Sequence, residues 1–171
     1  MTQKYDAGKG RLDLFPYDAV QVGKHYYPLD EMAPSIARWW YIRPRPLEVS
    51  IPERMLLDIG RVLAFGASKY VERGWEGGIA YSRLFAAAMR HSLAAGRGEV
   101  NDPESGLPHE AHFYCNLAFI VALGRRHGDK FDDRPAPDAK LVEQYDRVEA
   151  FVSQFTGAAQ PRPEPPQGEQ N

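Results

Sequence analysis

Residues 81–122 concentrate side chains that could do chemistry beside many alanines. The side chains in or near this stretch that offer a divalent cation an oxygen or imidazole donor are Glu99, Asp102, Glu104, His109, His112 and Asn116. His109, His112 and Asn116 are spaced i, i+3 and i+7, so on a helix they share one face. Magnesium and manganese prefer oxygen ligands, and manganese accepts histidine more readily. The pattern predicts a Mg²⁺ or Mn²⁺ site, with Glu99, Asp102 and His91 as the catalytic candidates.

A basic stripe is expected on the helix that precedes these acids. Arg83, Arg90 and Arg97 are seven residues apart, which keeps them near one line of an ideal helix, with alanines between them. A planar guanidinium pairs with two phosphate oxygens at once. A metal held by carboxylates beside such groups is the equipment for transferring a phosphoryl or nucleotidyl group to water. Arg83 and Arg90 are therefore candidate phosphate-binding residues.

Further substrate-binding candidates lie outside this stretch: Lys9, Arg11, Asp13, Lys69 and Trp75. Glycines surround Lys9, so the backbone there could approach a ligand closely. The block lacks a GK[ST] ending and is not a P-loop, and it could instead be an arm packed by its own apolar residues. Trp75, or the aromatic cluster Trp39–Tyr41, could stack on a nucleobase, although large aromatics more often complete a core.

Each of these features also has a purely structural interpretation. A single helical histidine is more often hydrogen-bonded structure, acids in a proline-containing turn often cap a helix, and an arginine stripe is often a solvated face. Glu99-x-x-Asp102 by itself is a weak signal, and Glu110 points about 100° away from the His109/His112 face. The functional interpretation depends on the coincidence of all these groups in one stretch.

The elements that must position these residues are helices. Ser50 three residues before Glu53, with Pro52 between, predicts a helix start at Ser50, and Gly66 interrupts the apolar run that follows. A second helix is expected over about 81–95, and a third from Pro108 to about Leu123, before Gly124. A fourth helix is expected to begin near residue 138. Its apolar residues alternate in steps of four and three, as in coiled coils: Leu141, Tyr145, Val148, Val152 and Phe155.

The prolines and aromatics of residues 21–49 argue against a long regular element there, and no strand of useful length is indicated. The predicted fold class is all-α, a bundle of about four main helices with an irregular N-terminal arm. Residues 1–156 are expected to form one domain, and 157–171 a disordered C-terminal tail.

Composition narrows the function classes. The chain has 171 residues, 21 basic and 23 acidic side chains, and a net charge of −2, so nothing favours a nucleic-acid partner. No apolar run approaches the roughly 20 residues of a membrane span, and there is no apolar signal region. Cys115 has no partner for an internal disulfide, which suits a reducing compartment. We therefore expect a soluble cytoplasmic protein with no membrane partner.

Several blocks of the sequence resemble one enzyme family: GKGRLDLFP (8–16), FGASKYVERGWEGG (65–78), MRHSLAAGRGEVNDPESGLPHEAH (89–112) and Asn116. Together they resemble the phage-encoded dATP/dGTP diphosphohydrolases, which are grouped with the MazG/HisE-like all-α nucleotide pyrophosphohydrolases. MazG relatives carry E-x-x-E on one helix and E-x-x-D on the next. This chain has no E-x-x-E, and Glu99-x-x-Asp102 falls at the end of an expected helix.

The resemblance implies a homo-oligomeric enzyme, a dimer or tetramer, in the host cytoplasm. It would use Mg²⁺ or Mn²⁺ to hydrolyse a purine deoxynucleoside triphosphate, dGTP above all, to dGMP and pyrophosphate, and so feed 2-aminoadenine synthesis for phage DNA. Two alternatives remain open at this point. One is an HD-type phosphohydrolase that releases inorganic triphosphate, although the chain offers only His109-Glu110 where that class needs a His-Asp pair. The other is a non-catalytic helical assembly or regulatory module built on the apolar face of residues 141–155.

Overall fold

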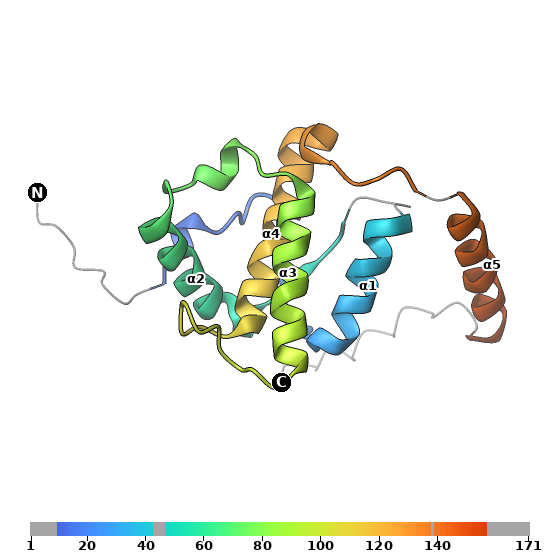
Figure 1. The fold of residues 1–171 in the computed structure, drawn as a ribbon, viewed down its shortest axis with the longest axis horizontal. Coiled ribbons are helices and arrows are strands. Elements are labelled where there is room, and N and C mark those ends of the chain that lie inside the picture. Colours follow the sequence, from blue (N-terminus) through green and yellow to red (C-terminus); the bar gives the residue numbers. More distant parts are fainter. Residues whose placement is uncertain (1–9, 43–46, 138, 157–171) are drawn as a thin grey trace, which may run out of the picture. The chain divides into compact units, whose positions relative to one another are not determined.

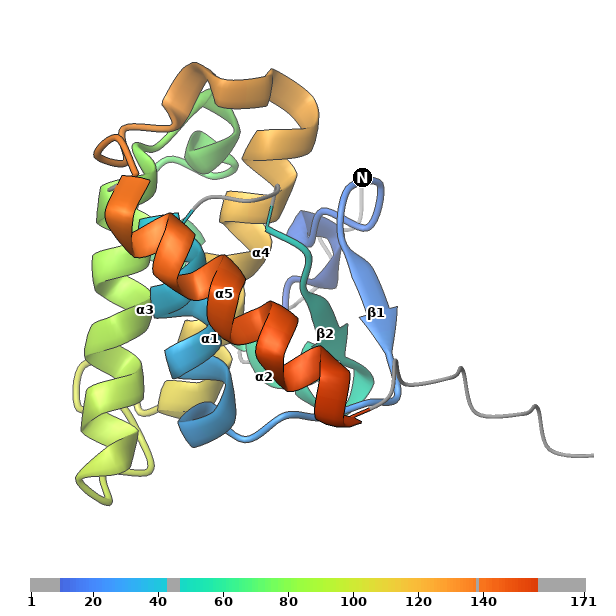
Figure 2. The same cartoon turned by 90° about the vertical axis from the view of Figure 1, so that its right-hand side faces the viewer.

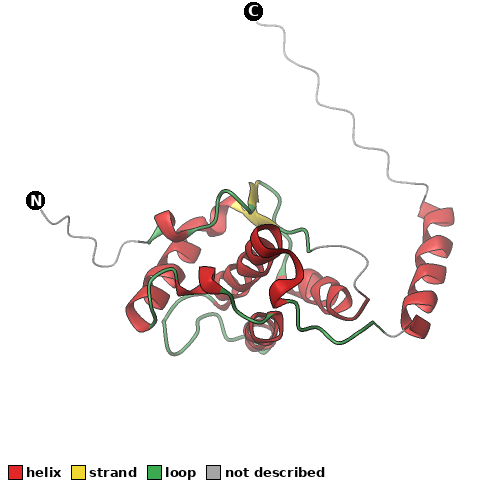
Figure 3. Cartoon of the chain, turned by 90° about the horizontal axis from the view of Figure 1, so that it is seen from above, coloured by secondary structure: helices red, strands yellow, loops and turns green. Residues whose placement is uncertain are grey.

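The computed structural model describes residues 10–42, 47–137 and 139–156. Two compact units, residues 1–136 and 137–171, divide the chain. The second contains α5 (Ala139–Thr156), which begins where a helix was expected. Residues 1–9 and 157–171, and with them Lys9 and the expected tail, lie outside the described residues. The all-α class is confirmed, because helices dominate the described chain and only one small sheet interrupts them (Figure 3).

The centre of the first unit is α4 (His109–His127), which lies alongside α3 (Tyr81–Gly96) (Figure 1). Both helices begin where the sequence predicts. However, the predicted end of α4 before Gly124 is wrong. The helix continues to His127 and is capped by Gly128, where φ is +59°. A Cβ on Gly124 would lie 2.8 Å from the Tyr81 hydroxyl oxygen, so this glycine allows close helix packing. The glycine is a packing residue of the helix and does not terminate it.

The predicted helix start at Ser50 is wrong. Ser50–Pro52 is instead the short strand β2, which pairs in parallel with β1 (Gln21–Gly23), as Figure 2 shows. Ile51 at the centre of β2 is fully buried, and its burial favours the strand over a solvent-facing cap. A 3₁₀ turn (Glu53–Met55) leads into α2 (Leu56–Lys69), and Gly66 lies inside α2 without interrupting it.

The expectation of no long element within residues 21–49 is also wrong, because α1 spans Leu29–Ile42. Pro28 immediately precedes α1, and its carbonyl accepts hydrogen bonds from the backbone N–H groups of Glu31 and Met32. Only Pro34 lies within the helix, where it removes one backbone donor. The apolar face of α1 carries two buried tryptophans, Trp39 and Trp40, whose burial outweighs that loss.

After α4 a 3₁₀ turn (Gly128–Phe131) leads to an ion pair that the sequence did not predict. Arg134 and Asp132 have side chains only 7% and 6% exposed, and their two contacts measure 2.7 and 2.8 Å. Arg134 also donates to the Trp39 carbonyl over 3.2 Å and lies 4.0 Å from the centroid of the Trp39 ring. This pair links the end of α4 to α1. Within the described residues, no helix combines the length and apolarity that crossing a membrane requires.

Candidate functional site

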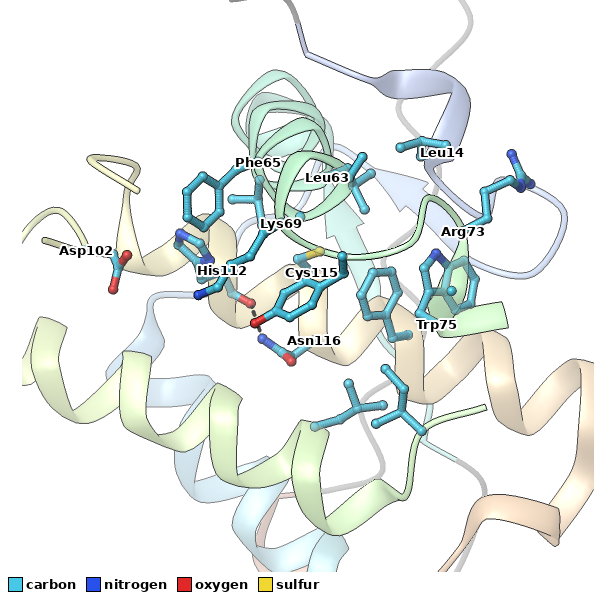
Figure 4. Close-up of a pocket in the computed structure, with 18 of the residues that line it drawn as sticks. Leu14, Leu63, Phe65, Lys69, Arg73, Trp75, Asp102, His112, Cys115 and Asn116 are labelled. Atoms are coloured by element: carbon cyan, nitrogen blue, oxygen red, sulfur yellow. Dashed lines mark hydrogen bonds between the residues drawn. The ribbon is translucent and has the colours of Figure 1, made fainter. Parts of the chain in front are cut away.

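A cavity of about 910 Å³ opens in the first unit between α2, α3, α4 and the segment that follows α2. This volume lies in the range of small-ligand sites. Eight residues that the sequence analysis singled out line it: Lys69, Trp75, Arg90, His91, Asp102, Glu104, His112 and Asn116. Figure 4 shows Asp102 and His112 at one end of the cavity, Arg73 and Trp75 at the other, and Lys69 and Asn116 between them.

Three histidines meet at the polar end of the cavity: His91 and His112 line it, and His109 contacts His91 without lining it. His91 comes from α3, and His109 and His112 come from the first turn of α4. The Nδ1 atoms of His91 and His109 are 2.9 Å apart, and the His91 ring stacks on His112 with centroids separated by 4.5 Å. His109 and His112 are buried. The close packing of α3 on α4 therefore gathers three imidazoles at one point.

Asp102 is held beside these histidines by Ser105. The backbone N–H and the hydroxyl of Ser105 donate to Asp102 Oδ2 over 2.9 and 3.0 Å. Ser105 Oγ also lies 2.7 Å from His112 Nε2. Ser105 was not predicted as a site residue, although an acid followed three residues later by serine is typical of a turn in which the acid accepts the backbone N–H. Ser105 thus connects the acidic turn to α4.

Burial controls the charge of this cluster. It lowers the pKa of His91 to about 4, with the neighbouring imidazoles acting in the same direction, and it also lowers the pKa of His112. Burial by itself raises the pKa of Asp102, but the hydrogen bonds from Ser105 and the nearby His112 bring it below its usual value. At neutral pH His91 and His112 are therefore neutral imidazoles beside the ionised Asp102 carboxylate, the protonation states that metal ligands need.

The donor atoms of His91, Asp102 and His109 all lie within 4.8 Å of one another. His109 Nε2 is buried and has no hydrogen-bond partner among the described residues. An unsatisfied buried imidazole is costly, so the cluster is not optimised for stability alone. Two imidazoles and one carboxylate fit Mn²⁺ better than Mg²⁺, which prefers oxygen and water.

The other candidate ligands lie around this set. Glu99 Oε2 approaches only His109 Nε2, at 3.9 Å, while its other oxygen accepts from Arg97 over 3.0 and 3.1 Å. Glu104 forms an ion pair with Lys69 across the cavity. The Asn116 side chain donates to the His112 carbonyl over 2.8 Å. Of the three predicted acidic ligands, Asp102 therefore lies within the set of converging donor atoms, whereas Glu99 and Glu104 lie outside it.

The cationic candidates separate into two groups. Lys69 and Arg90 line the cavity, whereas Arg83 lies exposed on α3 outside it. Arg11 is bound by Asp13 and by Glu72, at 2.7 and 3.0 Å, and neither Arg11 nor Asp13 lines the cavity. These two residues tie the N-terminal segment to the segment after α2.

Arg73 is a cavity residue that was not predicted from the sequence. It lines the cavity, pairs with Glu76 at 2.7 Å and donates to the Asp13 carbonyl over 3.3 Å. Arg73 has a φ of +58°, which is rare for a residue other than glycine. Such strain is retained where the surrounding contacts fix the backbone, and it often marks a functional segment. In the sequence, only Gly74 directly after Arg73 indicates a loop at this position.

The aromatic candidates for base stacking differ in whether they line the cavity and in how exposed they are. Phe119 stacks on Trp75 with ring centroids 4.4 Å apart, and the Arg126 guanidinium lies over the Trp75 ring at 5.2 Å. Trp75 is also only 9% exposed, so little of its ring is open to a ligand. Trp39 and Trp40 belong to the core and do not line the cavity, which matches the structural interpretation of that cluster. Tyr70, by contrast, lines the cavity and is 67% exposed.

Comparison with known proteins agrees with the resemblance stated for the sequence. The family model described as dATP/dGTP diphosphohydrolase, N-terminal, matches residues 41–134, which include every cavity-lining residue except Leu14. A protein of Salmonella phage PMBT28 named dATP/dGTP diphosphohydrolase is 32% identical over 123 residues, or 72% of this chain. The match covers 38% of that relative's length. No solved structure matches.

Proposed function

We propose that this chain, which belongs to the dATP/dGTP diphosphohydrolase family, hydrolyses a purine deoxynucleoside triphosphate, dGTP first, to its monophosphate and pyrophosphate with the help of a divalent metal. The single observation that carries the proposal is one cavity with a His/Asp donor set at its polar end and the cations Lys69 and Arg90 beside it. The name of the phage relative supports the substrate class. The product dGMP would feed 2-aminoadenine nucleotide synthesis, which the family resemblance alone suggests.

His91, Asp102 and His109 are the residues that would hold the metal. A divalent cation bound there would lower the pKa of a bound water and neutralise charge that develops on the phosphates. The chain's own contribution is to keep His91 neutral and Asp102 ionised, since the hydrogen bonds from Ser105 hold that carboxylate in place. The donor set leads us to expect that Mn²⁺ supports faster turnover than Mg²⁺.

Phosphate binding would fall to the cations along the cavity. Lys69 is paired with Glu104 in the structure, so a triphosphate would replace Glu104 as its partner. Arg90 is exposed and lines the same cavity from α3. Arg73 at the opposite end is held in place by its ion pair with Glu76, so we assign it a structural role in the lining of the cavity. Lys69 and Arg90 are therefore the principal candidates for orienting the triphosphate toward Asp102.

The base would lie on Tyr70 and not on Trp75. Trp75 is only 9% exposed, and its ring already contacts Phe119 and Arg126, which leaves little surface for a base. Tyr70 lines the cavity and is 67% exposed, with the Lys69 ammonium 5.5 Å from its ring centroid. A purine stacked on Tyr70 would leave its phosphates within reach of Lys69.

The products of dGTP hydrolysis, followed by ³¹P NMR with Mn²⁺ or Mg²⁺, test the proposal. We expect pyrophosphate and dGMP. Inorganic triphosphate would indicate the HD-type reaction, and no turnover with either metal would refute the proposal. A comparison of dGTP, GTP, dATP and dCTP then measures which purine is selected. The structure disfavours the HD alternative, because Glu110 binds Tyr26 and Arg54 and is directed away from the histidines.

The second alternative, a helical assembly module, predicts different sensitive residues. It requires Glu99→Gln and Asp102→Asn variants to keep all function, while changes at Tyr145 or Val148 of α5 abolish it. A homo-oligomer also belongs to our proposal, because Leu141 and Val148, seven residues apart on α5, are both exposed. Light scattering coupled to size exclusion, on the wild type and on Val148→Glu, tests this part.

A further inference from the structure

We infer that Glu99 is a positioning residue that keeps the proton of His109 on Nε2. The Nδ1 lone pair of His109 is then available to the metal donor set, and Arg97 holds Glu99 in place for this role. This inference rests on the proposed function for its metal and assigns Glu99 a role other than that of a ligand. It concerns a chain of three side chains, Arg97–Glu99–His109, that runs from the surface to the buried cluster.

The geometry of His109 leaves few possibilities. Its ring is nearly fully buried, with Nδ1 2.9 Å from His91 Nδ1 and Nε2 3.9 Å from Glu99 Oε2. Among the described residues nothing hydrogen-bonds to Nε2. A neutral imidazole carries one proton, on one nitrogen or the other. Which nitrogen carries it decides what His109 offers to His91 and Asp102.

Electrostatics decides between these two tautomers. A proton on Nδ1 would leave a bare lone pair on Nε2 facing a carboxylate, which is repulsive and leaves a buried acceptor unsatisfied. A proton on Nε2 points a donor at Glu99 Oε2 instead. The Nε2–H tautomer is therefore favoured, and in the metal-free protein its Nδ1 lone pair accepts a hydrogen bond from His91 Nδ1–H. Metal-bound histidines commonly donate their second N–H to a carboxylate in this way.

Glu99 is suited to this role because it is anchored from one side only. Arg97 Nε and Nη2 both donate to Glu99 Oε1, which leaves Oε2 free to turn toward His109. The Glu99 side chain is 46% exposed, so it can close the 3.9 Å gap to hydrogen-bonding distance without moving the buried ring. Glu99 is also absent from the group of donors that converge within 4.8 Å. It lies behind a ligand, on the side away from His91.

Two measurements on the full-length, metal-free protein test the inference. Long-range ¹H–¹⁵N NMR reads which nitrogen of His109 is protonated, and titration with Mn²⁺, followed by the EPR signal of the free ion, gives metal affinity. We expect the Nε2–H tautomer in the wild type and its partial loss in Glu99→Ala. The affinity of Glu99→Ala for Mn²⁺ should fall about 10- to 100-fold, the usual cost of losing an outer-shell partner.

Glu99→Gln is the conservative variant, because its amide oxygen can still accept from His109 Nε2. Its affinity for Mn²⁺ should stay within about tenfold of the wild type, since a neutral acceptor is roughly half as strong as a charged one. The matched control is Glu143→Ala on α5, which removes an exposed Arg–Glu pair of 2.5 Å and should leave both readouts unchanged. Circular dichroism confirms that each variant is folded.

Three results would overturn the inference. They are an Nδ1–H tautomer of His109 in the wild type, an unchanged tautomer and affinity in Glu99→Ala, and an affinity of Glu99→Gln as low as that of Glu99→Ala, which would make Glu99 a direct ligand. If the wild type binds no Mn²⁺, the metal part of the proposed function fails and the tautomer measurement alone decides the role of Glu99. If Glu99→Ala does not fold, the wild type and Glu99→Gln still decide it.

Discussion

Two buried polar clusters of this protein differ in how completely their hydrogen bonds are satisfied. In the Arg134–Asp132 pair, Nε, Nη1 and Nη2 of the guanidinium all donate, two to the carboxylate and one to the Trp39 carbonyl. In the histidine cluster between α3 and α4, His109 Nε2 is buried and has no hydrogen-bond partner within the part of the chain that the structure describes. The side chains of Arg134, Asp132 and His109 are each at most 7% exposed, yet among these described residues only His109 keeps a nitrogen that makes no hydrogen bond.

The difference separates a structural polar cluster from a functional one. A charged pair as deeply buried as Arg134–Asp132 is tolerated because its geometry satisfies the guanidinium and joins α4 to α1. The histidine cluster keeps unused donor capacity beside a cavity, where a ligand can use it. Burial of polar groups is therefore a poor guide to function here, and the unmet hydrogen bond is the informative observation.

The largest expected effect is a loss of folding stability when the Arg134–Asp132 pair is broken. Asp132→Ala leaves Arg134 buried without its carboxylate, so we expect the free energy of unfolding to fall by about 3–5 kcal/mol. The affinity of the folded protein for Mn²⁺ should not change. Urea unfolding followed by circular dichroism measures the effect, with exposed Asp129→Ala as the control. A loss below about 1 kcal/mol would show that the pair is not structurally essential.

Asp102→Asn probes the other cluster. The asparagine can still accept from Ser105 but no longer carries the charge a cation needs, so dGTP hydrolysis should fall by at least about 100-fold, more than an outer-shell change costs. The free energy of unfolding should change by only about 1 kcal/mol. Initial rates and urea unfolding are measured on the same preparation. Retained turnover would remove Asp102 from the site.

The pH dependence of stability distinguishes the clusters next. Burial lowers the pKa of His91 to about 4, against about 6.5 in the unfolded chain. Between these values the unfolded state binds a proton that the folded state resists, so stability should decrease as the pH falls from about 6.5 to about 4, by about 2–3 kcal/mol. His91→Gln should flatten this decrease. An equal slope in both proteins would contradict a buried neutral His91.

The smallest expected effect concerns the mouth of the cavity. Tyr70→Ala should raise KM for dGTP up to about tenfold with little change in kcat, the value of one aromatic stacking contact. Tyr70→Phe should behave like the wild type. Tyr41→Ala is a matched control, because Tyr41 is similarly exposed but does not line the cavity. Equal effects at Tyr70 and Tyr41 would rule out a base at Tyr70.

Much of the helical framework could be predicted from the sequence, because α3, α4 and α5 follow local periodicity and caps. The position of α1 could not, since counting prolines does not reveal that Pro28 precedes the helix and only Pro34 lies inside it. Ser50 was misread for a related reason. Its capping pattern is local, whereas its pairing with β1 depends on a segment almost 30 residues earlier.

The site was predictable in its composition but not in its geometry. The spacing of His109 and His112 reveals a shared face, but the approach of His91 depends on how closely α3 packs on α4, which Gly124 and Tyr81 permit. From the E-x-x-D spacing, Glu99 and Asp102 are equally good candidates for metal ligands. The structure separates them, since Ser105 holds Asp102 at the donor set while Arg97 holds Glu99 outside it.

The most direct test of the central claim is the position of the metal. A crystal structure of the Mn²⁺-loaded protein, with anomalous scattering at the manganese edge, locates the ion without reference to activity. We predict an anomalous peak within bonding distance of His91 Nδ1, His109 Nδ1 and a carboxylate oxygen of Asp102. A peak bound by Glu99 and Glu104 without imidazole ligands, or no peak between α3 and α4, would contradict it.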